Sequence, residues 1–263
     1  MTAAVSKFIQ AATDGSPLES ELVIDAHMHL GPYHNFFAPH TELEHQLKTA
    51  DRIGIDRLYG SSILAIANDA TAGNREVIGA AQASNQRFQP YLVAKPNYPE
   101  EFETIFTLAD AQGIFRFKLH DDKNNLPYDH PAYEPVYEFA DSRNAVILFH
   151  TYGDQHLPGL NRVAKQYKAI KILLAHSGIK DIDSYISIAR KYDNVFLETC
   201  NSWAWYGLIE DLVAGVGDEK VIFGTDMPFM SPEQQIGRIL FARISDESKR
   251  RILGQNANRH LNF

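Results

Sequence analysis

Residues 145–176, AVILFHTYGDQHLPGLNRVAKQYKAIKILLAH, contain two short apolar runs on either side of a segment with a different pattern. The runs Ala145–His150 and Ile170–His176 are rich in β-branched and other apolar residues, which is typical of strands. Between them, Gly159–Tyr167 places its apolar residues at helical spacing. A strand, a helix and a second strand in this order predict two parallel strands joined by a right-handed crossover. The stretch therefore favours an α/β fold.

The same unit recurs along the chain. The expected strands are Leu22–His29, Arg57–Ser61, Phe88–Ala94, Ile114–His120, Ala145–His150, Ile170–His176, Val195–Thr199 and Val221–Asp226. The expected helices are Glu42–Ile53, Asn74–Asn85, Pro99–Ala111, Pro131–Asp141, Gly159–Tyr167, Asp181–Tyr192, Trp203–Val213 and Pro232–Ala242. Eight alternating units predict a single (β/α)8 TIM barrel over residues 1–263. An open doubly wound sheet is the structural alternative.

Two short helical segments lie outside the eight units. Ala3–Ala12 is amphipathic, and Asp246–Leu253 has a helical pattern that ends at Gly254. We expect both segments to cap the bottom of the barrel or to pack on its flank. No linker rich in proline, glycine or serine separates them from the barrel units, so the sequence predicts one domain.

The composition argues against several classes of partner. Lys plus Arg number 25 against 33 Asp plus Glu, a net charge of −8, and no basic run is present, so we expect no nucleic-acid partner. Residues 1–21 contain neither the pattern of a signal peptide nor an apolar run of spanning length, so we expect no membrane association. Cys200 is the only cysteine, which excludes an intrachain disulfide and favours a reducing compartment. We expect a cytoplasmic protein with a small-molecule substrate.

His27 and His29 stand at alternate positions near the end of the first expected strand. Alternate residues of a strand point the same way, so both imidazoles project toward one side and their nitrogens can converge on one point. A lone His-x-His is a weak indication of metal binding, because exposed histidine pairs also occur without any function. The interpretation therefore depends on where the other histidines fall.

Later expected strands also end in residues that bind metals or carry protons, namely His120, His150, His176 and Asp226. The C-terminal strand ends of a barrel surround one mouth, where the catalytic residues of this fold collect, so residues far apart in sequence become neighbours. Zinc takes imidazole and carboxylate together, and catalytic sites keep one position open for water or substrate. The sequence therefore predicts a divalent metal held by His27, His29, His150 and Asp226.

Each of these residues also has a structural interpretation. His150 fits a hydrogen-bonded histidine at a strand end, and Asp226 fits a turn residue before Pro228. Taken alone, either interpretation is the better one. The placement of all four residues at one mouth favours the metal site over coincidence.

Three further residues are expected to bind the substrate. Lys118 and His120 share a parity with Arg116, so all three face the barrel interior if the strand is regular, but the pattern does not decide which of them reaches the metal. A lysine inside a barrel is more often an ion-pair partner or an anchor for a substrate anion than a metal ligand. Trp203 lies in the loop after the seventh strand and can form a substrate wall, although a packed loop without ligand contact is an equal alternative.

The sequence resembles the amidohydrolase superfamily, and within it the amidohydrolase-related group that contains the aminocarboxymuconate-semialdehyde and resorcylate decarboxylases. The resemblance covers nearly the full chain. It rests on six elements, which are Asp25–Gly31, Phe117–His120, His150, Ala175–Gly178, Phe223–Pro228 and the closing segment Ile252–Arg259. Together they are specific for the family and unspecific for the substrate.

The resemblance implies a single metal ion, usually zinc, held by His27, His29, His150 and Asp226. It also places His176 close to the substrate as a proton carrier or polarising group. Other branches of the superfamily hold two metals bridged by a carboxylated lysine, and Lys118 together with His176 could fill those roles. Homodimers are common in the resembled group.

We therefore expect a metal-dependent hydrolase for a small, carboxylated lactone, amide or ring acid. The metal would lower the pKa of its bound water to about 7, and Asp226 would accept the proton of that water. His176 would hydrogen-bond the developing oxyanion or protonate the leaving group.

Three alternatives stay open. The first is a non-oxidative decarboxylase that uses the same mononuclear site. The second is a TatD-like nuclease, which is disfavoured because its fourth-strand glutamate is not matched in Phe117–His120 and because the chain is acidic. The third is a barrel that binds a ligand without turning it over.

Overall fold

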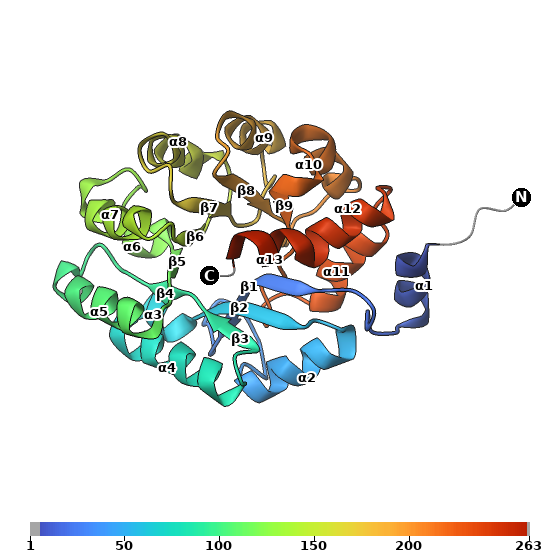
Figure 1. Ribbon diagram of the computed structural model, residues 1–263, viewed down its shortest axis with the longest axis horizontal. Helices are drawn as coiled ribbons and strands as arrows, with labels where there is room; N and C mark the ends of the chain where they lie inside the picture. Colours follow the sequence, from blue (N-terminus) through green and yellow to red (C-terminus); the bar gives the residue numbers. More distant parts are fainter. Residues whose placement is uncertain (1–5, 262–263) are drawn as a thin grey trace, which may run out of the picture.

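The computed structural model describes residues 6–261, and their strands form a closed parallel barrel surrounded by helices (Figure 1). The strands are β1 Ile24–Leu30, β2 Arg57–Ser62, β3 Phe88–Pro90, β4 Leu92–Val93, β5 Arg116–Leu119, β6 Val146–Phe149, β7 Lys171–Leu174, β8 Val195–Glu198 and β9 Val221–Ile222. Within residues 6–261, β3 and β4 are the two parts of the third expected strand, which is interrupted at Tyr91. The prediction of a (β/α)8 barrel is confirmed.

Two seams close the ring. The strand orders β1-β2-β3 and β4-β5-β6-β7-β8-β9 are parallel throughout. At the first seam the Tyr91 amide donates to the Gly60 carbonyl at 2.8 Å, so the interrupted strand keeps its contact with β2. At the second seam the Ala26 amide donates to the Phe223 carbonyl at 3.0 Å, which joins β1 to the end of β9. An open doubly wound sheet is therefore excluded.

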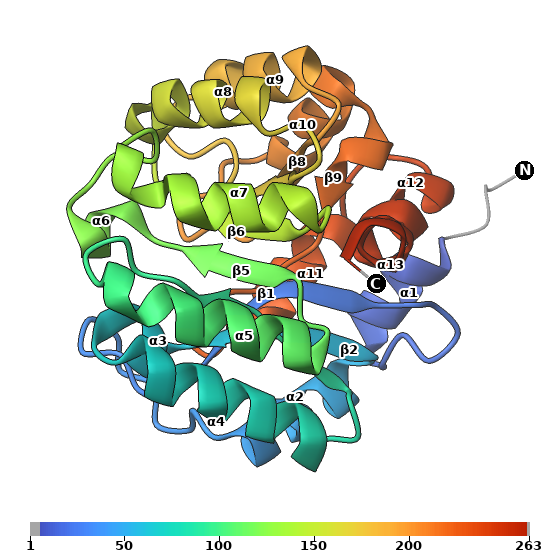
Figure 2. The ribbon, with the colours of Figure 1, turned by 60° about the vertical axis from the view of Figure 1, so that its left-hand side comes forward.

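The helices surround the barrel on the outside (Figures 1 and 2). They are α2 Leu43–Ile53, α3 Ile63–Ala67, α4 Ala70–Ala83, α5 Phe102–Gln112, α6 Asp121–Asn124, α7 Glu134–Ser142, α8 Leu157–Gln166, α9 Ile182–Lys191, α10 Leu208–Val216 and α11 Pro232–Leu240. Strand residues alternate between the two layers, because neighbouring side chains of a strand point to opposite faces. Phe117 and Ile147 pack in the outer cluster with the helices, whereas Val146 and Leu148 belong to the inner cluster of the barrel.

The helix expected from Trp203 begins five residues later, at Leu208. Gly207 precedes α10 with a φ of 91°, in the left-handed region, so a right-handed helix cannot run through it. Trp203 and Trp205 therefore lie in the loop between β8 and α10 rather than on a helix. The predicted start of this helix was wrong.

The C-terminal segment covers the bottom of the barrel, where Figure 1 shows α13 lying across the centre of the ring. Helix α12 Asp246–Arg250 continues through the π-helical turn η5 Arg251–Gln255 into α13 Asn256–Leu261. The predicted end at Gly254 was therefore wrong. A Cβ on Gly254 would lie 2.1 Å from the Leu22 carbonyl oxygen, so the glycine permits close packing against the chain before β1.

The N-terminal helix is α1 Lys7–Asp14, which buries Phe8. Of the amphipathic segment expected at Ala3–Ala12, residues 3–5 lie outside the described residues. No helix within residues 6–261 combines the length and the apolar character that crossing a membrane requires.

Candidate metal centre

An irregularity in β1 sets the direction of His27 and His29. The register between β1 and β2 shifts between Asp25 and Met28, so that Ala26 belongs to the inner cluster while both histidines also reach the interior. The buried Asp25 carboxylate holds this bend, because it accepts hydrogen bonds from the His27 amide at 3.0 Å and the Thr225 amide at 2.9 Å. The two imidazoles meet with their Nε2 atoms 3.2 Å apart.

Asp226 completes a group of three donors. Its Oδ1 lies 3.1 Å from Nε2 of His29 and 3.6 Å from Nε2 of His27. Asp226 has a φ of 57°, a conformation that aspartate tolerates better than most residues, and its amide donates to the His27 carbonyl at 2.7 Å. Two imidazoles and one carboxylate converge here, and their ligand atoms all lie within 4.8 Å of one another. This donor chemistry fits a divalent ion such as zinc.

The protonation states also suit a cation. Burial lowers the pKa of both His27 and His29, so their rings are neutral near pH 7. Burial pushes the pKa of Asp226 upward, but the hydrogen bond with His29 and electrostatic interactions with His176, His29 and Lys118 outweigh it and leave that pKa below its usual value. Neutral imidazoles and an ionised carboxylate are the forms that bind a metal.

The far ring nitrogens of both histidines have hydrogen-bond partners. His27 Nδ1 lies 3.1 Å from Oε2 of Glu198, and His29 Nδ1 lies 3.0 Å from the Ser61 hydroxyl. Such partners fix the tautomer and the orientation of a metal-binding histidine. The sequence patterns predict no role for Glu198, which falls within the seventh expected strand, or for Ser61. Their positions at the C-terminal ends of β8 and β2 were the available signal.

Gly224 makes room for Glu198. A Cβ on Gly224 would lie 2.3 Å from Oε1 of Glu198 and 2.9 Å from Cβ of His27. Real side chains do not tolerate such distances, so a larger residue here would displace both groups. The glycine is therefore part of the centre, although it carries no functional atom.

Lys118 reaches the donor group from β5. Its side chain is fully buried, and Nζ lies 3.1 Å from Nε2 of His27. Burial lowers the pKa of Lys118 to about 8, although the negative charge of Asp226 acts to raise it. Arg116, on the same face of β5, lies toward the barrel bottom and donates to the Leu261 carbonyl at 3.3 Å. The shared inward direction of Arg116 and Lys118 is as expected.

His150 lies beside His120. The two rings stack with centroids 3.8 Å apart and planes within 10°, and Nε2 of His150 lies 3.9 Å from Oδ2 of Asp122. The structure therefore groups His150 with His120 and Asp122 rather than with the three convergent donors. Its role as the fourth ligand stays a prediction.

His176 stands between the two groups of histidines. Its ring centroid lies 5.0 Å from that of His150 and 5.1 Å from that of His27. It has a φ of 55°, and its amide donates to Oε2 of Glu198 at 3.1 Å. Burial lowers the pKa of His176 to about 4, so the ring is neutral near pH 7.

A cavity of about 360 Å³ opens above these groups. Its polar floor consists of His29, His120, His150, His176 and Asp226. Its aromatic walls are Tyr33, Phe36, Tyr152 and Phe229, and Lys123 reaches in with Nζ 4.7 Å from the centroid of the Tyr33 ring. A small planar molecule with a polar group would fit such a site.

The other two expected substrate residues lie away from this cavity. Within residues 6–261, neither Lys118 nor Trp203 belongs to its lining. Trp203 is 66% exposed, and its neighbour Ser202 reaches the cavity instead. Substrate contact by Lys118 and Trp203 therefore stays a prediction.

A family model described as Amidohydrolase matches residues 24–263, whereas no curated protein matches the chain. Solved structures share the fold at low identity. A 2,6-dihydroxybenzoate decarboxylase from Rhizobium is 15% identical with a TM-score of 0.72, covering 92% of this chain and 98% of that one. A 5-carboxyvanillate decarboxylase from Novosphingobium aromaticivorans, complexed with manganese and 4-hydroxy-3-methoxy-5-nitrobenzoic acid, is 12% identical with a TM-score of 0.75, covering 94% and 97%. An uncharacterised TIM-barrel protein from Bordetella bronchiseptica is 16% identical with a TM-score of 0.76, covering 91% and 98%.

Proposed function

Because the chain belongs to the amidohydrolase family of enzymes, we propose that it is a metal-dependent hydrolase for a small, planar carbonyl compound such as a lactone, an amide or a ring acid. The observation that carries the proposal is the position and charge of Asp226. An ionised carboxylate lies at the cavity floor, in contact with two neutral histidines. Such a group accepts protons, which hydrolysis requires of the residue that activates water.

We assign the ion to His27, His29 and Asp226, with His150 as the expected fourth ligand. Imidazole and carboxylate together suit zinc, which is our first choice, and the manganese of the 5-carboxyvanillate decarboxylase complex makes manganese the second. When bound, the ion supplies a Lewis acid that polarises the substrate carbonyl and makes water more acidic.

The protein residues move the proton. Asp226 Oδ1 would accept it from the attacking water, since this carboxylate is ionised and lies at the cavity floor. His176 Nδ1 lies 3.3 Å from the Cys200 carbonyl, an acceptor, so the ring proton sits on Nδ1 and Nε2 is free of hydrogen. Nε2 of His176 can then receive a proton and pass it to the leaving group.

The cavity selects the substrate class. Tyr33, Phe36 and Phe229 lie with their rings 5.1 to 5.9 Å apart, so they form one aromatic wall for a planar molecule. The Lys123 ammonium gives this wall a positive charge that suits a carboxylate. His120 has a buried Nδ1 with no hydrogen-bond partner among the described residues, and a substrate oxygen would satisfy it.

Non-oxidative decarboxylation is the second candidate. Two solved structures with this fold are decarboxylases of hydroxylated aromatic acids, and the aromatic wall beside Lys123 suits such a substrate as well. The two reactions differ in whether a carbon atom of the substrate must take up a proton. Decarboxylation needs a proton donor for the ring carbon, whereas the groups on the cavity floor are an ionised Asp226 and a neutral His176. The decarboxylases that share the fold support this candidate at least as well as hydrolysis, so the assay must separate the two reactions.

The test is a panel of lactones, amides and aromatic acids, assayed with the metal-loaded protein in ¹⁸O-labelled water. We expect ¹⁸O in a product and no release of carbon dioxide. Asp226→Asn should lower turnover by about 100-fold or more, the scale of a general base. The exposed Asp154→Asn serves as the matched control and should keep full activity. Carbon dioxide release without ¹⁸O uptake would replace hydrolysis by decarboxylation, and no turnover of any panel member would remove the proposal.

A further inference from the structure

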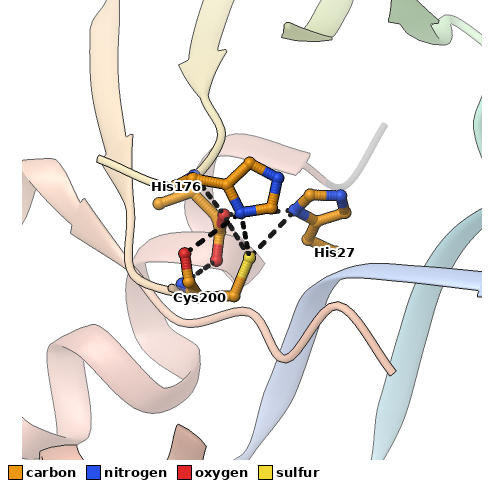
Figure 3. A group of neighbouring side chains, drawn as sticks. His27, His176 and Cys200 are labelled. Carbon is orange, nitrogen blue, oxygen red and sulfur yellow. Dashed lines mark hydrogen bonds and ion pairs between the residues drawn. The ribbon is translucent and has the colours of Figure 1, made fainter. Parts of the chain in front are cut away.

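Four donor atoms, from His27, His176, Glu198 and Cys200, meet beside Nδ1 of His27. Figure 3 labels three of these residues, His27, His176 and Cys200. Cys200 Sγ lies 3.3 Å from Nδ1 of His27, 3.2 Å from Nδ1 of His176 and 3.0 Å from Oε2 of Glu198. The same Glu198 oxygen lies 3.1 Å from Nδ1 of His27. All four residues are buried. Cys200 is the only cysteine in the chain, and the sequence analysis gave it no role.

We infer that His27, His176, Glu198 and Cys200 form an inner cation site for a borderline-soft divalent ion such as Zn²⁺, with the Cys200 thiolate as one ligand. This site is distinct from the one at the cavity floor. It uses Nδ1 of His27, whereas the donors at the floor use Nε2 of the same ring.

Four of the six distances among the donors are close to those of a tetrahedral set, and all the donors lie within 4.8 Å of one another. Zinc lies about 2.0–2.1 Å from nitrogen or oxygen and about 2.3 Å from sulfur, so neighbouring tetrahedral ligands are about 3.3–3.6 Å apart. The distances from Sγ to the three other donors are 3.0 to 3.3 Å. Along these contacts an ion would require an outward movement of only a few tenths of an ångström.

The charges balance as well. A thiolate and a carboxylate carry two negative charges, so a divalent ion between them leaves the buried site neutral, as a low-dielectric interior requires. Without an ion, the Cys200 thiol donates to the Glu198 carboxyl.

A purely supporting role explains Glu198 but not Cys200. The carboxylate alone is enough to hold the Nδ1 proton of His27, as a partner of a metal-binding histidine does. The sulfur adds a soft donor that contacts all three other groups, and zinc sites combine cysteine and histidine ligands. Binding of the inner ion moves the ring proton of His176 from Nδ1 to Nε2, because Nδ1 becomes a ligand atom. Occupation of both sites together also requires His27 to lose its ring proton and bridge the ions, so the second ion should bind more weakly than the first.

Cobalt(II) titration of the metal-free full-length protein tests the inference, because thiolate ligation gives a near-ultraviolet charge-transfer band that nitrogen and oxygen ligands do not. We expect the band in the wild type and its loss in Cys200→Ser, together with loss of about one ion per chain. His29→Ala removes a donor of the floor site alone, so it should lose the floor ion and keep the band. The inner site and the proposed hydrolase site can thus fail separately.

Absence of the band in the wild type at saturating cobalt would overturn the inference. So would a band that survives in Cys200→Ser. Zinc-edge X-ray absorption of the wild type gives a readout that needs no variant, should Cys200→Ser fail to fold. A sulfur scatterer at about 2.3 Å supports the inner site, and its absence rejects it.

Discussion

Replacement of Gly224 by alanine is the sharpest perturbation of the centre that adds no charge. The new Cβ would lie 2.3 Å from Oε1 of Glu198 and 2.9 Å from Cβ of His27. Both groups are fully buried, so neither can swing into solvent. One of them must shift, and overpacking of this kind costs about 1–3 kcal/mol.

Two consequences should be measurable. For a chain of this size, each 1 kcal/mol lowers the melting temperature by about 2–4 °C, so Gly224→Ala should melt about 2–12 °C below the wild type. Displacement of Glu198 from Nδ1 of His27 should also weaken metal binding by about 10–100-fold. Calorimetry of the metal-free protein and competition with a chromophoric chelator give the two values.

Gly79→Ala is the matched control. Gly79 is exposed within α4, and a Cβ there meets nothing within 4 Å. Alanine favours a helix interior over glycine by about 0.5–1 kcal/mol, so this variant should be slightly more stable and bind metal like the wild type. If Gly224→Ala matches the wild type in melting temperature and in metal affinity, the reasoning is refuted, because the close packing of Glu198 against Gly224 then contributes neither to stability nor to metal binding.

Three further predictions concern single side chains. Glu198→Gln removes the carboxylate beside His27 and should lower the affinity of the floor ion by about 10–100-fold in chelator competition, and an unchanged affinity would contradict its supporting role. His176→Ala should keep the floor ion and lose about 100-fold or more in turnover, whereas Asp226→Ala should lose both. Loss of the floor ion from both variants, measured by chelator competition in a Cys200→Ser background that lacks the inner site, would make His176 a ligand of the floor ion. Burial lowers the pKa of the half-buried His260 to about 4, so the folded state resists a proton that the unfolded chain takes up near pH 6.5. Its contribution to stability is complete above pH 6.5 and is lost as the pH falls toward 4, so the urea midpoint should drop less over this window in His260→Leu than in the wild type.

The fold followed from the sequence because alternation of strands and helices is a local pattern. The eight strand positions were found, and convergence of His27, His29 and Asp226 followed from the rule that parallel strands of a barrel end at one mouth. The inward direction of Lys118 followed from strand parity, because β5 is regular as far as Leu119.

Side chains beyond the strand ends were harder to place. His150 comes just after the last residue of β6, where strict alternation no longer sets its direction, and it stacks on His120. His176 and Asp226 have positive φ angles, which no periodicity predicts. Cys200 lies two residues after β8, so its contact with His27 depends on the turn that follows the strand.

Glycines were misleading for a related reason. Gly254 fits the pattern of a helix end, but its role is to permit close contact with Leu22, a residue more than 200 positions away in the sequence. Gly207 had no assigned role and yet determines where α10 begins. Contacts between distant segments cannot be derived from local patterns.

The most direct test of the account is anomalous X-ray diffraction at the zinc edge, on crystals grown with Zn²⁺. The account predicts an anomalous peak among Nε2 of His27, Nε2 of His29 and Oδ1 of Asp226, with the cavity open on one side of the ion. A crystal of the folded protein saturated with zinc, with no peak between these three atoms, would contradict the central claim.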